Sequence, residues 1–226
     1  MNAIPVSETI AILGGTGKEG KGLALRWAKA GYHIIIGSRS LIRARTAALE
    51  ILDLLDGKAL IEWATNVEAA RVADIVVLTV PYSVHRPTLE SIKEVLQGKI
   101  LVDVTVPLSP HSVTEVHLPP GGSAAMEARM ILGENVQVAS AFQNISYERL
   151  RQGGPIECDV LVTGTGNKAR SETLKLVNAA GLTGWDAGPL ENSVVTEGLT
   201  SLLININRQY GSTNAGIKIV GVTKEK

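Results

Sequence analysis

Short aliphatic runs alternate with longer helical patterns along the whole of this chain of 226 residues. The first run, Thr9–Leu13, is followed by glycines and a helical pattern over 18–30, and further runs occupy 32–37, 59–64, 75–80, 100–106 and 136–142. Strands that alternate with helices are typical of a parallel sheet with crossover helices. The runs contain few polar residues, which indicates strands buried on both faces. We therefore predict an α/β fold with a doubly wound parallel sheet.

The pattern changes in the second half of the chain. Prolines and glycines interrupt all periodicity over 108–122, and a stretch of this length is usually functional or mobile. After Asn144 a smaller set of elements follows, with strands expected at 159–163 and 184–187 and a last helix over 192–210. We predict a first domain over 1–150 and a small C-terminal α/β extension over 151–226, placed on the substrate side.

Charge and composition exclude several classes of protein. Lysine and arginine number 22 and aspartate and glutamate number 22, so the formal net charge is zero and offers no basic footprint for nucleic acid or anionic lipid. The one cysteine, Cys158, excludes an internal disulfide and a multi-thiolate metal site. No apolar run approaches the roughly 20 residues of a membrane span, and the N-terminus lacks the layout of a signal peptide. We expect a cytoplasmic protein that binds no metal, nucleic acid or membrane.

The segment after the first strand carries a G-x-G-x-x-G motif, formed by Gly15, Thr16, Gly17, Lys18, Glu19 and Gly20. A buried strand precedes it and a helical pattern follows it, which is the context of a dinucleotide-binding turn. In such a turn the glycines allow a tight bend and close backbone approach, and the free N–H groups of the helix bind a diphosphate. The motif predicts a Rossmann-type domain.

The end of the second strand distinguishes the two nicotinamide dinucleotides. An NAD site has an acidic residue there, which accepts hydrogen bonds from the ribose. This chain has Ser38 and Arg39 at that point and Arg43 close behind, with no acid before Glu50. Guanidinium and hydroxyl groups suit a 2′-phosphate, so we predict NADP as the cofactor.

Ligands of open α/β sheets lie beyond the carboxyl ends of the strands. Thr79, Pro81 and Tyr82 stand at the end of the fourth predicted strand, and Val106 and Pro107 stand at the end of the fifth. The prolines withhold N–H donors and stiffen the strand ends, which suits an apolar wall against a nicotinamide ring. No constellation of acid, base and nucleophile is visible, and the four histidines are scattered along the chain. We therefore expect no catalytic side chain, and we expect His85 to be dispensable for the chemistry.

Several blocks of sequence resemble the NADPH-dependent coenzyme F420 reductase family. They are residues 12–17 and 20–26, the Gly37-Ser38-Arg39 triplet, the Asp186-Ala187-Gly188-Pro189-Leu190 block, and Glu197, Asn205 and 216–218 in the tail. The resemblance extends over nearly the whole chain and implies direct hydride transfer between NADP and a deazaflavin, coenzyme F420, in a homodimer. It also implies that Tyr82, Val106 and Tyr147 line the nicotinamide. On the substrate side we expect Gln143, Asn144, Ile145, Asn205 and Asn207.

The chain departs from the family pattern at one place. Gln143 occupies the position of a family histidine that faces the deazaflavin, and Phe142 replaces the neighbouring leucine. Two other hypotheses therefore stay open. The first is an NADPH-dependent reductase of another flavin or of a small carbonyl or imine, and the second is a non-catalytic NADPH-sensing module.

Overall fold

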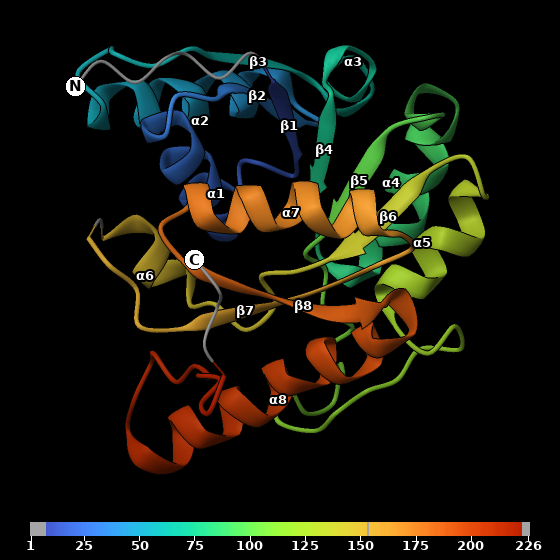
Figure 1. Ribbon diagram of the computed structural model, residues 1–226. Helices are drawn as coiled ribbons and strands as arrows, with labels where there is room; N and C mark the ends of the chain where they lie inside the picture. Colours follow the sequence, from blue (N-terminus) through green and yellow to red (C-terminus); the bar gives the residue numbers. More distant parts are fainter. Residues whose placement is uncertain (1–7, 153, 223–226) are drawn as a thin grey trace.

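Eight strands form one sheet in the order β3-β2-β1-β4-β5-β6-β7-β8 (Figure 1). The structure, a computed structural model, describes residues 8–152 and 154–222. The strands are β1 (Thr9–Leu13), β2 (His33–Ser38), β3 (Ile61–Thr65), β4 (Ile75–Leu78), β5 (Ile100–Asp103), β6 (Gln137–Ser140), β7 (Asp159–Gly164) and β8 (Thr183–Pro189). The first six run parallel, and the predicted doubly wound sheet is confirmed.

Helices cover both faces of this sheet. One face carries α1 (Lys18–Lys29), α2 (Leu41–Leu54) and α7 (Asn167–Ala179). The other carries α3 (Asn66–Val72), α4 (His85–Ile92) and α5 (Ala124–Leu132). The remaining helices are α6 (Tyr147–Arg151), α8 (Ser193–Tyr210) and the short 3-10 turns η1 (Tyr82–Val84), η2 (Lys93–Leu96) and η3 (Leu190–Asn192). The long helix α8 lies at the bottom of the view, away from α2 and α3 at the top (Figure 1).

The central strand β1 divides the core into two layers because successive side chains of a strand point to opposite faces. Ile10 and Ile12 pack beneath α1 and α2, whereas Ala11 and Leu13 pack beneath α3 and α4. All four are fully buried. This explains why the strand is apolar without alternation: neither face meets water.

The chain reverses direction at β7, which pairs antiparallel with β6, while β8 pairs parallel with β7. Each crossover between two parallel strands carries the chain from the carboxyl end of one strand back to the edge of the sheet where the next strand begins. In the described part of the connection between β6 and β7 the only helix is the five-residue α6, and the chain enters β7 from the end at which it left β6. A pattern of aliphatic runs carries no record of strand direction, and the sequence therefore did not predict this reversal.

The expected domain boundary at 150/151 falls inside α6, which packs on α1. Arg26 of α1 donates hydrogen bonds to the backbone oxygens of Arg149, Leu150 and Gly154 at 2.8–2.9 Å. A Cβ atom on Gly22 would lie 2.7 Å from Cβ of Leu150, so the glycine permits this close contact. Both predicted parts contribute strands to the same sheet, and the division into two domains stays a prediction.

Element boundaries differ from expectation in a consistent way. β4, β5 and β6 end two or three residues before the aliphatic runs do, because the chain leaves the sheet while it is still buried. Thr65 caps α3, with reciprocal hydrogen bonds to Glu68. Among the described helices, none is long and apolar enough to cross a membrane.

Candidate functional site

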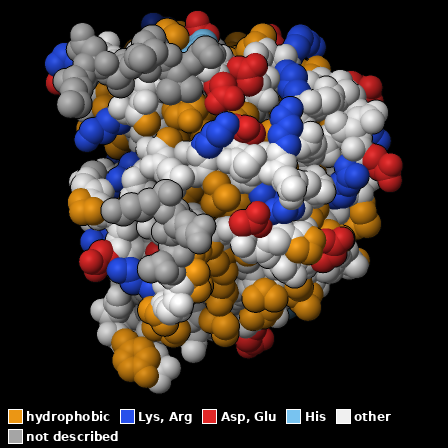
Figure 2. Space-filling model, viewed as in Figure 1, with side chains coloured by type: hydrophobic (Ala, Val, Ile, Leu, Met, Phe, Trp, Pro, Cys, Tyr) orange, Lys and Arg blue, Asp and Glu red, His pale blue; other side chains and the backbone are white. Residues whose placement is uncertain are grey.

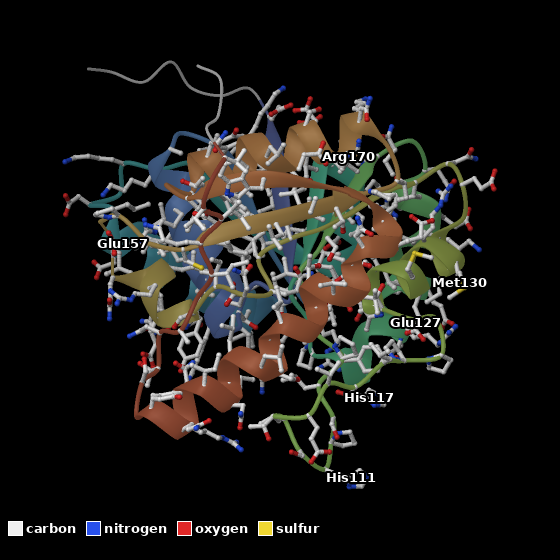
Figure 3. All side chains as sticks on the ribbon, turned by 60° about the horizontal axis from the view of Figure 1, so that its bottom comes forward. His111, His117, Glu127, Met130, Glu157 and Arg170 are labelled. Carbon is white, nitrogen blue, oxygen red and sulfur yellow. The ribbon has the colours of Figure 1, made fainter. Side chains whose placement is uncertain are left out.

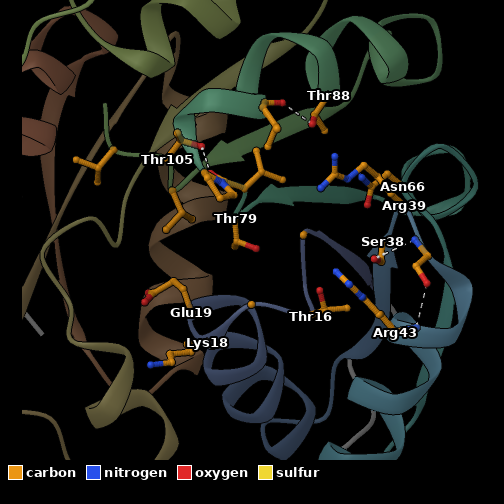
Figure 4. A pocket seen from close by; sticks show the side chains of 18 of the residues that line it. Thr16, Lys18, Glu19, Ser38, Arg39, Arg43, Asn66, Thr79, Thr88 and Thr105 are labelled. Carbon is orange, nitrogen blue, oxygen red and sulfur yellow. Dashed lines mark hydrogen bonds between the residues drawn. The ribbon is translucent and has the colours of Figure 1, made fainter. Parts of the chain in front are cut away.

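A cavity of about 460 Å³ opens at the carboxyl ends of β1, β2, β4 and β5 (Figure 4). The order of the sheet reverses between β1 and β4, and ligands of open α/β sheets bind at such a switch point. The volume is within the range of small-molecule sites. Its lining residues are Gly14, Thr16, Gly17, Lys18, Glu19, Ser38, Arg39, Ser40, Arg43, Asn66, Thr79, Val80, Pro81, Val84, Thr88, Val104, Thr105, Val106 and Leu108.

The glycine-rich turn forms the floor of this cavity. Gly14, which precedes the motif, adopts a positive φ of 74°, a conformation that favours glycine. Gly15 donates its N–H to the carbonyl groups of Ile12 and Gly37 at 3.2 Å, which bends the chain out of β1. A Cβ atom on Gly20 would lie 2.7 Å from Cα of Gly15 and 2.8 Å from Oγ1 of Thr79. Gly20 therefore lets α1 start directly against the turn and the end of β4.

The amino terminus of α1 faces the cavity without a side-chain cap. The N-cap residue is Gly17, which has no side chain to accept from the first helical N–H groups. Unsatisfied N–H groups and the positive end of the helix dipole together bind phosphate and other anions. The turn can therefore bind an anion through backbone atoms.

At the end of β2 the cavity is cationic. Arg39 and Arg43 are exposed, and within the described part of the chain their guanidinium groups have neither a hydrogen bond nor an ion pair. Ser40 caps α2 by accepting from N–H of Arg43 at 3.4 Å, which fixes the orientation of the helix start. Oγ of Ser38 accepts from N–H of Ser40 at 3.2 Å. Figure 4 places both arginines and Ser38 on the side of the cavity opposite Lys18 and Glu19.

The third wall comes from the ends of β4 and β5. Thr79 bonds to the carbonyl of Leu13 through its backbone N–H at 2.9 Å and its hydroxyl at 3.0 Å, which ties this wall to the turn. Pro81 and Val106 add apolar surface to this wall. Pro81 also has no backbone N–H to donate. Predicted residue Tyr82 does not line the cavity, since its hydroxyl donates to Oε2 of Glu127 at 2.8 Å. Burial and this hydrogen bond raise the pKa of Tyr82 to about 12.

A buried ionic pair lies behind this wall. Nε2 of His85 is 2.6 Å from Oδ2 of Asp103, and both side chains are almost fully buried. Burial alone would lower the pKa of His85, but the Asp103 carboxylate outweighs it and raises the pKa above its ordinary value. Asp103 also accepts from N–H of Thr105 at 2.9 Å. The pair therefore fixes the position of α4 relative to the end of β5.

A second buried carboxyl group, that of Glu197 on α8, accepts from N–H of Ala124 at 2.7 Å and of Ala125 at 3.1 Å. Burial, followed by the charge of Asp103, raises the pKa of Glu197 to about 8, although the two N–H groups act in the opposite direction. Next to it, the hydroxyl groups of Ser123 and Ser193 are 2.6 Å apart. These contacts hold α8 against the start of α5.

The residues predicted for the substrate side are not gathered in the cavity. The Gln143 amide donates to the carbonyl of Asp103 at 2.9 Å and to Oγ of Ser140 at 2.7 Å, so it ties β6 to β5. Asn144 donates to the carbonyl of Asp159 at 2.7 Å, and Ile145 is part of the core.

The remaining predicted residues lie on α8 and α6. Asn205 is exposed on α8, and Oδ1 of Asn207 accepts from N–H of Ala215 at 2.9 Å. Tyr147 accepts from Nζ of Lys18 at 3.2 Å, which brings it to the rim of the glycine turn. Of the predicted cofactor residues, Gly15, Gly20, Tyr82 and Tyr147 are outside the cavity lining, and the others are part of it.

Sequence reasoning missed several lining residues, among them Gly14, Asn66, Val84 and Thr88. Asn66 directly follows β3, and the rule that ligands lie beyond strand ends, applied to that strand, would have found it. Thr88 and Val84 belong to the start of α4, and only the position of that helix over the strand ends brings them in. His111 and His117 occupy separate points of the loop over 108–122 (Figure 3). Among the described residues, no three His, Cys, Asp or Glu side chains are grouped as metal ligands are.

The arrangement suits an elongated polyanion attached to a flat ring. The backbone anion site, the two unpaired arginines and the largely uncharged wall at β4 and β5 follow one another around a single cavity. No nucleophile with an activating base lines it. Its residues can therefore bind and orient a ligand.

Comparison with known proteins gives consistent matches. The family model described as NADP oxidoreductase, coenzyme F420-dependent, matches residues 9–107. The F420-dependent NADP reductase of Methanothermobacter marburgensis is 41% identical over 220 residues, which is 94% of this chain and 98% of that protein. The protein of the same name from Methanocaldococcus jannaschii is 39% identical over 221 residues, with 94% and 98% covered.

Among solved structures, a putative F420-dependent NADP reductase from Arthrobacter sp. FB24 superposes with a TM-score of 0.80. The superposition covers 95% of this chain and 100% of that one, at 24% sequence identity. At this identity the likeness supports the fold alone.

Proposed function

Because the chain belongs to the F420-dependent NADP reductase family, we propose that it is an oxidoreductase that transfers a hydride directly between NADP(H) and coenzyme F420. The observation that carries the NADP half is the pairing, in one cavity, of an uncapped helix terminus with two unpaired arginines and no acid at the end of β2. A diphosphate and a 2′-phosphate need these two groups at opposite sides of the same cavity.

The residues present fit NADP well. Thr16, Gly17, Lys18 and Glu19 would surround the diphosphate, which would accept from the free N–H groups at the start of α1 and from the ammonium group of Lys18. Gly15, whose N–H is bonded within the turn, and Gly20 would keep the turn tight. Ser38, Arg39 and Arg43 would hold the 2′-phosphate, and a carboxylate at that point would have repelled it. Thr79, Pro81 and Val106 would form the wall next to the nicotinamide, with Tyr82 behind the wall and Tyr147 at the rim.

When bound, NADP(H) supplies or accepts the hydride at its nicotinamide ring. The work of the protein is then positioning and exclusion of water, since a direct hydride transfer needs neither a nucleophile nor a strong acid or base. Thr79 is fixed by two bonds to Leu13, and Pro81 and Val106 present carbon atoms. A rigid apolar wall restricts the orientations of a flat ring and keeps water from it.

The acceptor half of the proposal is supported by family membership over nearly the whole chain, including α8. Gln143, Asn144, Ile145, Asn205 and Asn207 are the proposed substrate-side residues. The amide nitrogen of Gln143 already donates twice within the protein, and its backbone carbonyl accepts from the hydroxyl of Thr200 at 2.8 Å, so its side-chain oxygen is what it would offer to a ligand. We assign residues 1–150 to NADP binding and 151–226 to the acceptor side, and the cytoplasmic location stays a prediction.

A homodimer is supported by an apolar stripe on α8. Val195, Leu202, Ile206 and Tyr210 are exposed, and their spacing of seven, four and four residues places them on one side of a helix. Figure 2 shows hydrophobic side chains exposed in the lower part of the view, over the region of α8. A stripe of this kind pairs with its own copy in a two-fold dimer.

The proposed reaction is tested by following NADPH oxidation against a panel of acceptors: the deazaflavin, FMN, FAD, a small ketone and a cyclic imine. We expect turnover with the deazaflavin alone. Turnover of FMN, the ketone or the imine without turnover of the deazaflavin would contradict the proposal and support another reductase activity. Tight NADPH binding with no turnover of any acceptor would support an NADPH sensor.

A further inference from the structure

Glu19, the second residue of α1, lines the proposed NADP cavity with a carboxyl group that has no partner. The side chain is half-buried, but its Oε1 atom is enclosed and accepts no hydrogen bond from the described residues. In Figure 4 Glu19 lies next to Lys18, across the cavity from Arg39 and Arg43. A buried carboxylate without donors is costly, and most such groups are hydrogen-bonded.

No positive charge in the described structure compensates Glu19. On α1 itself, Nζ of Lys18 is directed to Tyr147 of α6, 3.2 Å from its hydroxyl and 4.7 Å from its ring centre. Lys21, one turn further along α1, pairs with Glu50 of α2 at 2.8 Å.

Arg39 and Arg43 line the same cavity at its opposite side, and neither is bonded to Glu19. The walls at β4 and β5 offer no counter-charge. The end of β4 contributes the uncharged Thr79 and Pro81, and the end of β5 contributes Thr105 and Val106. Behind that wall, His85 and Asp103 pair with each other, and Tyr82 pairs with Glu127. With burial as the cause, the pKa of Glu19 is raised to about 8.

A dinucleotide in the cavity makes the ionised carboxylate still less favourable. The free N–H groups at the start of α1 are the donors for the diphosphate, and Glu19 belongs to the same first turn. The dipole of the helix favours one anion at this terminus. A diphosphate and a carboxylate at the same terminus repel each other in a partly dehydrated cavity.

Resting on the proposed function, we propose that Glu19 is a positioning residue of the NADP site that stays protonated while the dinucleotide is bound, so that binding at alkaline pH takes up one proton from solvent. Protonated Glu19 retains a hydroxyl that donates a hydrogen bond toward the anionic ligand. Below about pH 8 the free protein already carries this proton, and binding is then independent of Glu19 ionisation. Above that pH each binding event needs one proton, and the Kd rises tenfold for each pH unit.

The test is titration of the full chain with NADP⁺ from pH 7 to pH 9.5, by fluorescence for the Kd and by calorimetry in two buffers of different ionisation enthalpy for the proton count. We expect the Kd to rise about tenfold between pH 8.5 and 9.5, with uptake that approaches one proton. Glu19→Gln keeps an uncharged donor, so its Kd should stay flat over this range and its proton uptake should vanish. Glu134→Gln, at an exposed glutamate outside the cavity, should behave as the unmodified protein does.

The outcomes separate this inference from the proposed function. A Kd that is independent of pH with no proton uptake, or a Glu19→Gln variant with the full pH dependence, would overturn the role of Glu19 and leave NADP binding intact. Failure of the unmodified protein to bind NADP⁺ at pH 7 would overturn the proposed function itself. The measurements on the unmodified protein stand even if the variant does not fold.

Discussion

The guanidinium group of Arg39 stands at the end of β2 with no carboxylate near it in the described structure. If it binds the 2′-phosphate, Arg39→Ala should weaken NADPH binding by at least tenfold, since charge-assisted hydrogen bonds are worth about 1.5–3 kcal/mol. Binding of NADH, which lacks that phosphate, should change little. Arg45→Ala is the matched control, because Arg45 lies nearby on α2 and its guanidinium group is over the ring of Trp63. Fluorescence titration with both dinucleotides measures these effects, and an equal loss for both would contradict the assignment.

Gly20 is the glycine whose replacement should do most harm to the turn. An alanine Cβ would lie within 2.8 Å of both Gly15 and Thr79, and the first of these contacts is with backbone. We expect Gly20→Ala to lower the free energy of unfolding by about 1–3 kcal/mol, which is typical of overpacking, and to weaken NADPH binding. Gly166→Ala serves as control, since its Cβ would meet no atom within 4 Å. Urea denaturation of both variants gives the comparison, and equal stabilities would refute the steric argument.

At the residue scale, the sequence predicted those parts of the site that a local pattern encodes. The glycine turn and the Arg39 position follow from spacing along the chain. The isolation of Glu19 and the His85–Asp103 pair depend on residues that are distant in sequence, and no local pattern contains them. His85 is an example of a residue whose role no local pattern predicts. It was expected to be dispensable for the chemistry, and its buried contact with Asp103 gives it a structural role.

The junction between α5 and α8 makes stability depend on pH. Glu197 has a pKa of about 8 in the folded chain and an ordinary value of 4.5 when exposed. The folded state therefore keeps a proton that the unfolded state releases. The stabilisation is complete below about pH 4.5 and is lost as the pH rises to about 8, at up to about 1.4 kcal/mol per pH unit.

We accordingly expect the free energy of unfolding to fall between pH 5.5 and 7.5, with Glu19 contributing in the same direction. Glu197→Gln should be less stable throughout, because its amide oxygen can accept from only one of the two N–H groups of α5. The slope against pH should nevertheless be smaller than in the unmodified protein. Urea unfolding at several pH values measures the slope of the free energy of unfolding against pH. An equal slope in the variant and the unmodified protein would show that Glu197 ionises normally.

At the element scale, the alternation of aliphatic runs and helical patterns predicted almost every strand and helix. The strands ended early where buried chain continues past the last sheet hydrogen bond, as at Val104 and Ala141. Hydrophobicity reports burial, and burial continues beyond the sheet at strand ends that are covered by loops. The direction of β7 could not be predicted, because it is set by the path of the connection after β6.

For the whole molecule, the stripe on α8 predicts a homodimer. Leu202→Asp would place a charge in the centre of the stripe and should shift the protein from dimer to monomer, because burial of an unpaired charge is costly. Leu54→Asp, at an exposed leucine on α2, should leave the mass unchanged. Sedimentation equilibrium distinguishes these states. A monomeric unmodified protein would contradict the dimer, and a dimeric Leu202→Asp variant would place the interface elsewhere.

We propose that the protein acts as a scaffold that brings two rings together for direct hydride transfer. The most direct measurement is reduction of the deazaflavin with NADPH that carries deuterium at both C4 positions, followed by mass spectrometry of the product. Direct transfer predicts one deuterium in each reduced deazaflavin and none released to water. Loss of the deuterium to solvent, or no reduction of the deazaflavin, would contradict direct hydride transfer.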